Sequence, residues 1–327
     1  MKQKFFVYYF LLTNCCNGLS ISGGKTSLRM DIGENFFSPN FPSEVLPVSL
    51  NNPTRVNHNR NLLMKAESSI GMPWRESIDQ VQELTFMSFW SYQIDFMKQH
   101  LTDMRMGEVC DRDKTEDFSF AESNGVRIGN LSFSSREFRK IRMTYYDAGK
   151  QAQVFNTLWY PDPKYNLPVL GVDLLQFGGG KRNLVVIDFQ PIQEDNGATS
   201  VAHEKYDQYL KQIRDQFPSL QGKMSDRFYD ESQFFSKQML FGRFGENQVE
   251  AILDELWPAF QQSLEAYTCM FHQTNANDLQ QSQVLERQRA YDIYSADRDP
   301  ALAMFKAKFG EKWAEAFVHD FLFDLSR

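Results

Sequence analysis

The chain has 327 residues, of which 42% are hydrophobic and 14% aromatic, and its net charge is -7. This length allows one sizeable core or two small ones, and an acidic chain is not expected to bind nucleic acid broadly. Four cysteines without a CxxC pair argue against a disulfide framework or a zinc site and favour a reducing compartment: Cys15, Cys16, Cys110 and Cys269.

Residues 1–60 are predicted to be a targeting leader that ends in a disordered linker, and 61–327 a single folded domain. A basic start precedes the apolar run 5–12, as in a signal peptide, and this run is too short to span a bilayer. Residues 20–29 lack acids and resemble a transit peptide. A signal peptide followed by a transit peptide predicts import into a plastid stroma. Simple secretion is the alternative, but the scarcity of cysteine argues against it.

Residues 77–104 have apolar side chains at helical spacing and predict one long helix. A charged loop follows at 113–117. Apolar residues then alternate on both sides of Asn124-Gly125, a turn signal for a β-hairpin. The alternation changes phase after Ile128, which predicts a bulge or bend at Gly129-Asn130.

A basic cluster accompanies the strand pattern of Ile141, Met143 and Tyr145. Two interpretations stay open for it. Such clusters are usually a solvated face, but these cations could instead bind an acidic protein or the carboxylates of a ligand. The cluster consists of Arg136, Arg139, Lys140 and Arg142.

Three apolar runs, 154–160, 169–175 and 184–189, are separated by turn residues and predict consecutive antiparallel hairpins. Asp173 interrupts the second run on the face that it shares with Gly171. A carboxylate among apolar neighbours carries a desolvation cost, and the glycine leaves space beside it. The pattern fits either an acid at a strand end that is solvated or bonded to a turn, or an acid with a raised pKa that protonates a flat ligand.

After residue 192, the pattern predicts helices, most of them with apolar residues along one face. The predicted helices are 206–217, 247–257, 258–271, 278–296 and 313–325. Strands followed by helices predict the α+β class. Asp299-Pro300 has the form of a helix N-cap followed by proline at the first helical position.

Other kinds of site are not supported. The run Gly178-Gly179-Gly180-Lys181 lacks the spacing of a phosphate loop, and no GxGxxG motif suggests a nicotinamide cofactor. The five histidines are scattered without metal-ligand spacing.

Several separated motifs resemble the ferredoxin-dependent bilin reductases. They include TYYDAGKQAQVFN, GVDLLQFG, VIDFQPIQ and YDIYSADRDPA, and the likeness runs from about Trp74 to Leu325. The resemblance implies a three-layer α/β/α sandwich, with a central antiparallel β-sheet flanked by helices and the bilin between the sheet and the C-terminal helices. It also implies that no flavin or metal is bound and that reduced ferredoxin supplies the electrons.

The resemblance further implies roles for individual residues. Asp173 matches the family's central acid and is the expected proton donor, and Asp299 matches its second acid. Asn156 occupies a position where a relative with a different product has histidine. Relatives that reduce the terminal A-ring carry arginine at the position of Ser295. Arg142, Asn156 and Gly171 are expected to bind substrate.

Asn156 and Ser295 differ from the residues of those other relatives. The two differences favour a two-electron reduction of biliverdin IXα at the C15=C16 bridge, in phycoerythrobilin biosynthesis. Reduction of another bilin double bond, such as that of the A-ring, and a non-catalytic bilin carrier are the alternatives. Expected partners are ferredoxin, biliverdin IXα and a following bilin reductase. We expect a monomer that binds neither nucleic acid nor membrane.

Overall fold

The structure is a computed structural model that describes residues 84–192, 201–224, 234–248, 251–277 and 280–327. The predicted leader, at 1–60, and the first residues of the predicted domain lie outside these ranges. Among the described residues, no helix is both long and apolar enough to cross a bilayer.

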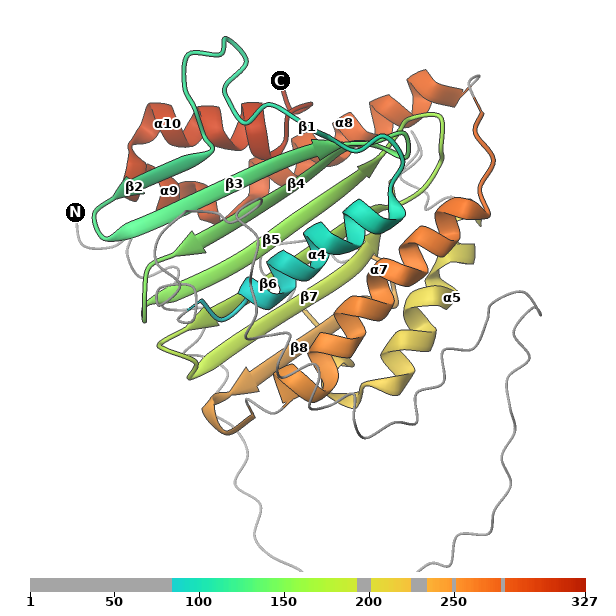
Figure 1. The fold of residues 1–327 in the computed structure, drawn as a ribbon, viewed down its shortest axis with the longest axis horizontal. Coiled ribbons are helices and arrows are strands. Elements are labelled where there is room, and N and C mark those ends of the chain that lie inside the picture. The colour runs from blue at the N-terminus through green and yellow to red at the C-terminus, as the bar shows by residue number, and fades with distance from the viewer. Residues whose placement is uncertain (1–83, 193–200, 225–233, 249–250, 278–279) are drawn as a thin grey trace, which may run out of the picture. The chain divides into compact units, whose positions relative to one another are not determined.

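One antiparallel sheet of eight strands organises the described chain (Figure 1). Its path runs β1-β3-β4-β5-β6-β7-β8, and β2 also pairs with β3. The three hairpin strands predicted at the centre are present as consecutive neighbours β5, β6 and β7. The strands are β1 Arg105–Met106, β2 Phe120–Ser123, β3 Val126–Ser134, β4 Phe138–Asp147, β5 Ala152–Pro161, β6 Val169–Phe177, β7 Arg182–Gln190 and β8 Leu240–Gly245.

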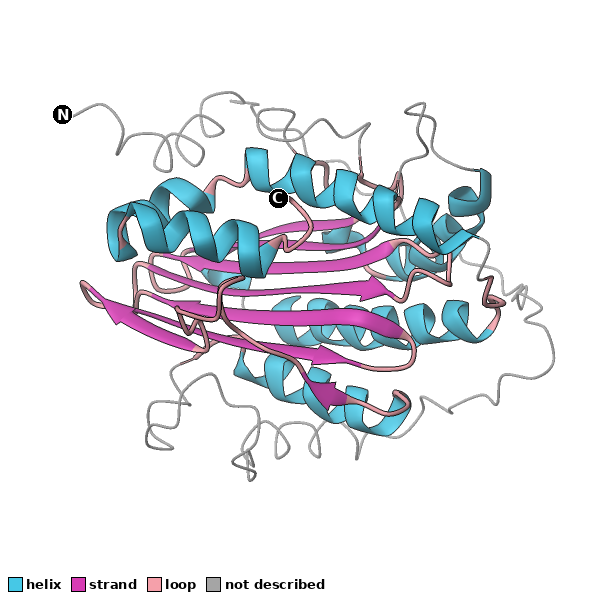
Figure 2. Ribbon diagram, turned by 90° about the horizontal axis from the view of Figure 1, so that it is seen from above, coloured by secondary structure: helices cyan, strands magenta, loops and turns pink. Residues whose placement is uncertain are grey.

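Helices cover both faces of the sheet, as Figure 2 shows, which confirms the predicted three-layer α+β sandwich. One face carries α4, α5 and α7, and the other carries α8, α9 and α10. The helices are α4 Met87–His100, α5 Val201–Gln216, α7 Trp257–His272, α8 Gln281–Arg298, α9 Ala301–Phe309 and α10 Glu311–Ala316; short helical segments are Pro218–Leu220, Glu246–Gln248, Ile252–Leu256 and Phe317–Leu322.

Alternation along each strand divides the buried apolar residues into two cores. Leu170, Val172 and Leu174 of β6 face the layer of α4, α5 and α7. Val169 faces the opposite layer, together with side chains from α8, α9 and the C-terminal segment. Asp173 therefore lies on the face covered by the C-terminal helices, because residues two apart on a strand share a face.

The hairpin predicted at Asn124-Gly125 is confirmed. Both residues have positive φ, 53° and 70°, as a two-residue turn between right-twisted strands requires. The bulge predicted at Gly129-Asn130 is wrong: β3 pairs with β4 in unbroken register from Arg127 to Phe133. The change of phase has another cause. Both faces of β3 are covered, so apolar residues are needed on each of them.

One boundary and one strand differ from the predictions. Helix α4 ends at His100, because Leu101 is extended and Glu137 binds the amide of Thr102 at 3.0 Å. Strand β8 lies in a region for which only helices were predicted. It is short and contains two glycines, so its pairing with β7 was not evident from the local pattern.

Candidate active site

A row of polar side chains crosses three neighbouring strands on the face of α8, α9 and α10. Arg142 of β4 donates from Nη1 to Asn156 Oδ1 on β5 at 2.6 Å. Asn156 Nδ2 in turn donates to Asp173 Oδ1 on β6 at 3.2 Å. Asn156 and Asp173 are direct cross-strand partners, so the sheet register brings this amide and this carboxylate together.

Asp173 is half-buried in this row. The pKa of its carboxyl is raised to about 7, mainly by burial and also by the charge of Asp299, although Asn156 and Arg142 lower it. A large fraction of Asp173 is therefore protonated at neutral pH. The structure thus favours the acid with a raised pKa over the solvated acid near a strand end.

Asp299 lies at the junction of α8 and α9. Its carboxylate accepts a 2.8 Å hydrogen bond from the amide of Ala301, so it caps α9 as predicted. Burial raises its pKa, and the Ala301 amide and the charge of Arg142 lower it. The charges of Asp299 and Arg142 both act on the pKa of Asp173, and the charge of Arg142 also acts on that of Asp299.

The C-terminal segment orients Arg142, which is only 2% exposed. The carbonyl oxygen of Leu322 accepts from Arg142 Nε at 2.8 Å, and the guanidinium carbon lies 5.4 Å from the centre of the Phe323 ring. One edge of the guanidinium is thus fixed by backbone far along the chain, while Nη1 reaches Asn156.

The expected open space beside Gly171 is absent. A side-chain carbon at Gly171 would lie 2.7 Å from Gln190 Oε1 of β7, so this amide occupies the room that glycine leaves. The hydroxyl of Tyr291 on α8 donates to the same oxygen at 2.5 Å. Glycine is needed here for the close approach of a neighbouring side chain.

The basic cluster is mostly not a solvated face. Arg136 is exposed and pairs with Asp103, but Arg139, Lys140 and Arg142 point toward the C-terminal layer. Burial lowers the pKa of Lys140 to about 8, although the charge of Asp324 raises it. The solvated interpretation therefore holds for Arg136 alone among the four.

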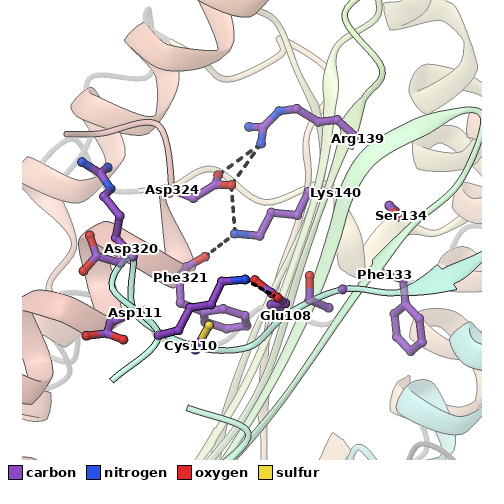
Figure 3. A pocket seen from close by; sticks show the side chains of 14 residues that line it. Glu108, Cys110, Asp111, Phe133, Ser134, Arg139, Lys140, Asp320, Phe321 and Asp324 are labelled. Carbon is purple, nitrogen blue, oxygen red and sulfur yellow. Dashed lines mark hydrogen bonds and ion pairs between the residues drawn. The ribbon is translucent and has the colours of Figure 1, made fainter. Parts of the chain in front are cut away.

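A cavity of about 380 Å³ lies beside these cations, between the sheet and the C-terminal segment (Figure 3). Asp324 points between Arg139 and Lys140, at 3.2 Å and 3.3 Å, and the carbonyl of Phe321 accepts from Lys140 at 2.6 Å. Arg139 and Lys140 are thus paired within the protein. Asp173, Asn156 and Asp299 do not line it.

Two further carboxylates, both of residues that are 0% exposed, were missed. Burial raises the pKa of Asp188 on β7 to about 7, and it also raises that of Asp292 on α8. Asp292 accepts from the Tyr160 hydroxyl at 2.8 Å and from the Leu325 amide at 3.0 Å. Asp188 interrupts the apolar run 184–189, which is the same signal that identified Asp173.

The arrangement can donate a proton near neutral pH. It combines a carboxyl of raised pKa, an amide that cannot titrate and a cation that is held in place. Among the described residues, no group of three or more His, Cys, Asp or Glu side chains is arranged to hold a metal ion.

Comparison with known proteins gives matches over most of this fold. The family model of the ferredoxin-dependent bilin reductases matches residues 85–324. The 15,16-dihydrobiliverdin:ferredoxin oxidoreductase of Nostoc punctiforme is 41% identical over 62% of this chain and 80% of that protein. The protein of the same name from Prochlorococcus marinus strain AS9601 is 32% identical over 71% of this chain and 96% of that protein.

A solved structure is similar in fold. The phytochromobilin synthase of tomato, crystallised in complex with biliverdin, gives a TM-score of 0.59 at 20% identity over 74% of this chain and 84% of that chain. The match of the family model covers the sheet, the helical layers and both acids of the site. This chain belongs to the ferredoxin-dependent bilin reductases.

Proposed function

We propose that this protein reduces the C15=C16 bridge of biliverdin IXα to 15,16-dihydrobiliverdin, with electrons from reduced ferredoxin, on the route to phycoerythrobilin. Relatives with up to 41% identity that carry the corresponding enzyme name support this substrate and bond. The observation that carries the proposal is Asp173, a carboxyl with a pKa of about 7 that lies in one polar row with Asn156 and Arg142.

The reaction adds two electrons and two protons across one carbon–carbon double bond. Ferredoxin delivers electrons singly, so the conjugated bilin holds an unpaired electron between the two transfers. The residues must exclude water and supply protons at the chosen carbons. Asp173 is the proposed donor, because its raised pKa keeps it protonated where an ordinary aspartate is ionised. Asp299 is the proposed second acid of the site.

The side chains around these acids support a single two-electron reduction. Asn156 places an amide, which cannot titrate, directly beside Asp173, so this position supplies no additional proton. Ser295, four residues before Asp299, leaves that turn of α8 without the arginine expected for reduction of the A-ring. Arg142 and Asn156 are the proposed substrate contacts. Near Gly171, a bilin would meet the amide of Gln190 rather than open space.

The proposal also includes the setting of the reaction. The protein acts as a monomer without a bound flavin or metal, in the stroma of a plastid that its leader addresses. Its product passes to a following bilin reductase. The acidic net charge of -7 supports the expectation that nucleic acid is not a partner.

The test is incubation of the protein with biliverdin IXα, ferredoxin and a ferredoxin-reducing system, followed by absorption spectroscopy and chromatography. The expected result is a shift of the bilin absorption to shorter wavelength and a product that elutes with authentic 15,16-dihydrobiliverdin. An A-ring-reduced product would identify a different reductase. A bound bilin whose spectrum stays constant under reduction would identify a carrier and reject the proposal.

A further inference from the structure

Asp188 is a buried acid for which the proposed proton transfers have no use. It is 0% exposed, lies on the same sheet face as Asp173, and is the cross-strand partner of Gly171. Both of its carboxylate oxygens are occupied by one residue: Oδ2 accepts from the amide of Ser236 at 2.9 Å, and Oδ1 accepts from its hydroxyl at 2.5 Å. Burial disfavours the charged carboxylate and raises its pKa to about 7. Because an acid is costly at this position, a role beyond packing is indicated.

A residue close to this contact along the chain has a strained backbone. Phe234, two residues before Ser236, has a φ of +61°, which an L-residue with a bulky side chain rarely adopts. Such conformations persist only where the surroundings enforce them, and they occur at sites where the shape matters. The ring of Phe234 is 5% exposed and packs on Tyr291 at 5.5 Å and on Tyr294 at 5.0 Å between ring centres.

Tyr291 connects Phe234 to the surroundings of Asp173. Its hydroxyl holds Gln190, and Gln190 covers Gly171, two residues from Asp173 on the same face of β6. The charge of Asp188 also raises the pKa of Tyr291. A continuous set of contacts thus leads from Asp188 through the loop before β8 to the surroundings of the proposed proton donor.

We propose that Asp188 is a positioning residue: through Ser236 and Phe234 it fixes the Tyr291–Gln190 pair that borders the bilin beside Asp173. This inference rests on the proposed function. The position of a bilin along β6 decides which of its carbons meets Asp173, and a side chain fixed over Gly171 limits that position. Asp188 therefore contributes to the choice of the bond that is reduced.

The first test needs no bilin. Amide hydrogen exchange is measured by mass spectrometry in Asp188→Asn, which replaces one of the two oxygens that accept from Ser236 with an NH₂ donor. We expect faster exchange in residues 234–240 and in the part of α8 that carries Tyr291. The matched control is Asp147→Asn, which alters another buried acid, on β4, that pairs with Arg127 and not with Ser236. It should leave exchange in 234–240 unchanged. Ser236→Ala, which removes only the hydroxyl, should give a smaller change in the same direction.

The second test uses turnover. Asp188→Asn should lower kcat/KM by about tenfold and yield a mixture of reduced bilins, since a misplacement of about 1 Å can cost as much as a hundredfold. If Asp188 acts through Phe234, the double variant Asp188→Asn/Phe234→Ala should be no worse than the poorer single variant. Ser236→Thr keeps both donors and should retain the wild-type product.

The results distinguish the inference from the proposed function. Unchanged exchange in residues 234–240 of Asp188→Asn, or effects on kcat/KM that multiply in the double variant, would overturn the positioning role. A single unaltered product from Asp188→Asn would do the same. A wild-type protein that leaves biliverdin unchanged rejects the proposed function, and the exchange measurement still decides whether Asp188 holds Phe234.

Discussion

Asn156 and Asp173 face each other across β5 and β6, and the side-chain nitrogen of Asn156 donates to Asp173 at 3.2 Å. The orientation of this amide is fixed from its other end, because its oxygen accepts from Arg142 at 2.6 Å. Asn156 can therefore only donate to Asp173. One carboxyl oxygen of Asp173 is held by this bond, which leaves the other oxygen to carry the proton.

Replacement of Asp173 separates binding from protonation. Asp173→Asn keeps the shape of the side chain and removes its acid, so the variant should bind biliverdin and show a bound-bilin spectrum. Turnover should fall by about 100-fold or more, the usual contribution of a general acid. Asp215→Asn, on the exposed surface of α5, is the control and should leave turnover unchanged. Full activity of Asp173→Asn would remove the assignment of the proton donor.

The rate should depend on pH through the same group. Asp173 has a pKa near 7 in the folded protein, and a proton donor must be protonated, so its active form predominates below that pH. We expect kcat/KM to be constant at low pH and to fall as the pH rises through about 7. Stopped-flow measurements from pH 5.5 to 9 give the profile. A flat profile over this range would contradict the role of Asp173.

Stability should show the cost of the raised pKa. Between the ordinary value of 3.8 and about 7, the folded state keeps the proton of Asp173 and the unfolded state releases it, so the free energy of unfolding falls with rising pH. Asp173→Asn lacks this cost. It should be more stable than the wild type at pH 8 by roughly 2–4 kcal/mol, at about 1.4 kcal/mol per pKa unit, and no more stable at pH 4. Urea unfolding at the two pH values measures both differences; equal values at pH 8 would contradict the raised pKa.

The charge and the geometry of Arg142 can be tested separately. The guanidinium lowers the pKa of Asp173, so Arg142→Gln should move the midpoint of the pH–rate profile upward. Arg142→Lys keeps the positive charge but lacks the planar guanidinium that donates to Leu322 and Asn156 at the same time. The midpoint should therefore change less, while KM rises. Identical midpoints in the wild type and Arg142→Gln would show that this charge does not act on the donor.

The ion cluster beside the cavity should be a determinant of stability. Asp324 pairs with Arg139 and Lys140, and these two cations lower its pKa although burial raises it. Asp324→Asn leaves two largely buried cations undercompensated and should lower the free energy of unfolding by about 1–3 kcal/mol. Asp103→Asn breaks the exposed pair with Arg136 and should cost well under 1 kcal/mol. Similar losses in the two variants, measured by urea unfolding, would contradict the difference in burial.

Much of the architecture follows from local pattern. Alternation along 154–160, 169–175 and 184–189 located three central strands, and the short turns between them required antiparallel neighbours. The same alternation placed Asp173 on one face, and the Asp299-Pro300 pair predicted the cap of α9. These features depend only on residues that are close in the chain, so the sequence by itself determined them.

Contacts between distant segments decided the rest. The phase change in β3 indicates two covered faces rather than a bulge, but only the packed helices distinguish these cases. Likewise, Gln190 fills the space at Gly171. Arg142, which could have been a solvated cation, is instead buried and held by the carbonyl of Leu322 in the C-terminal segment. Neither fact is encoded by local periodicity. The environment of a side chain is set by what packs against it, and in this sheet the packing partners come from chain segments up to 185 residues away.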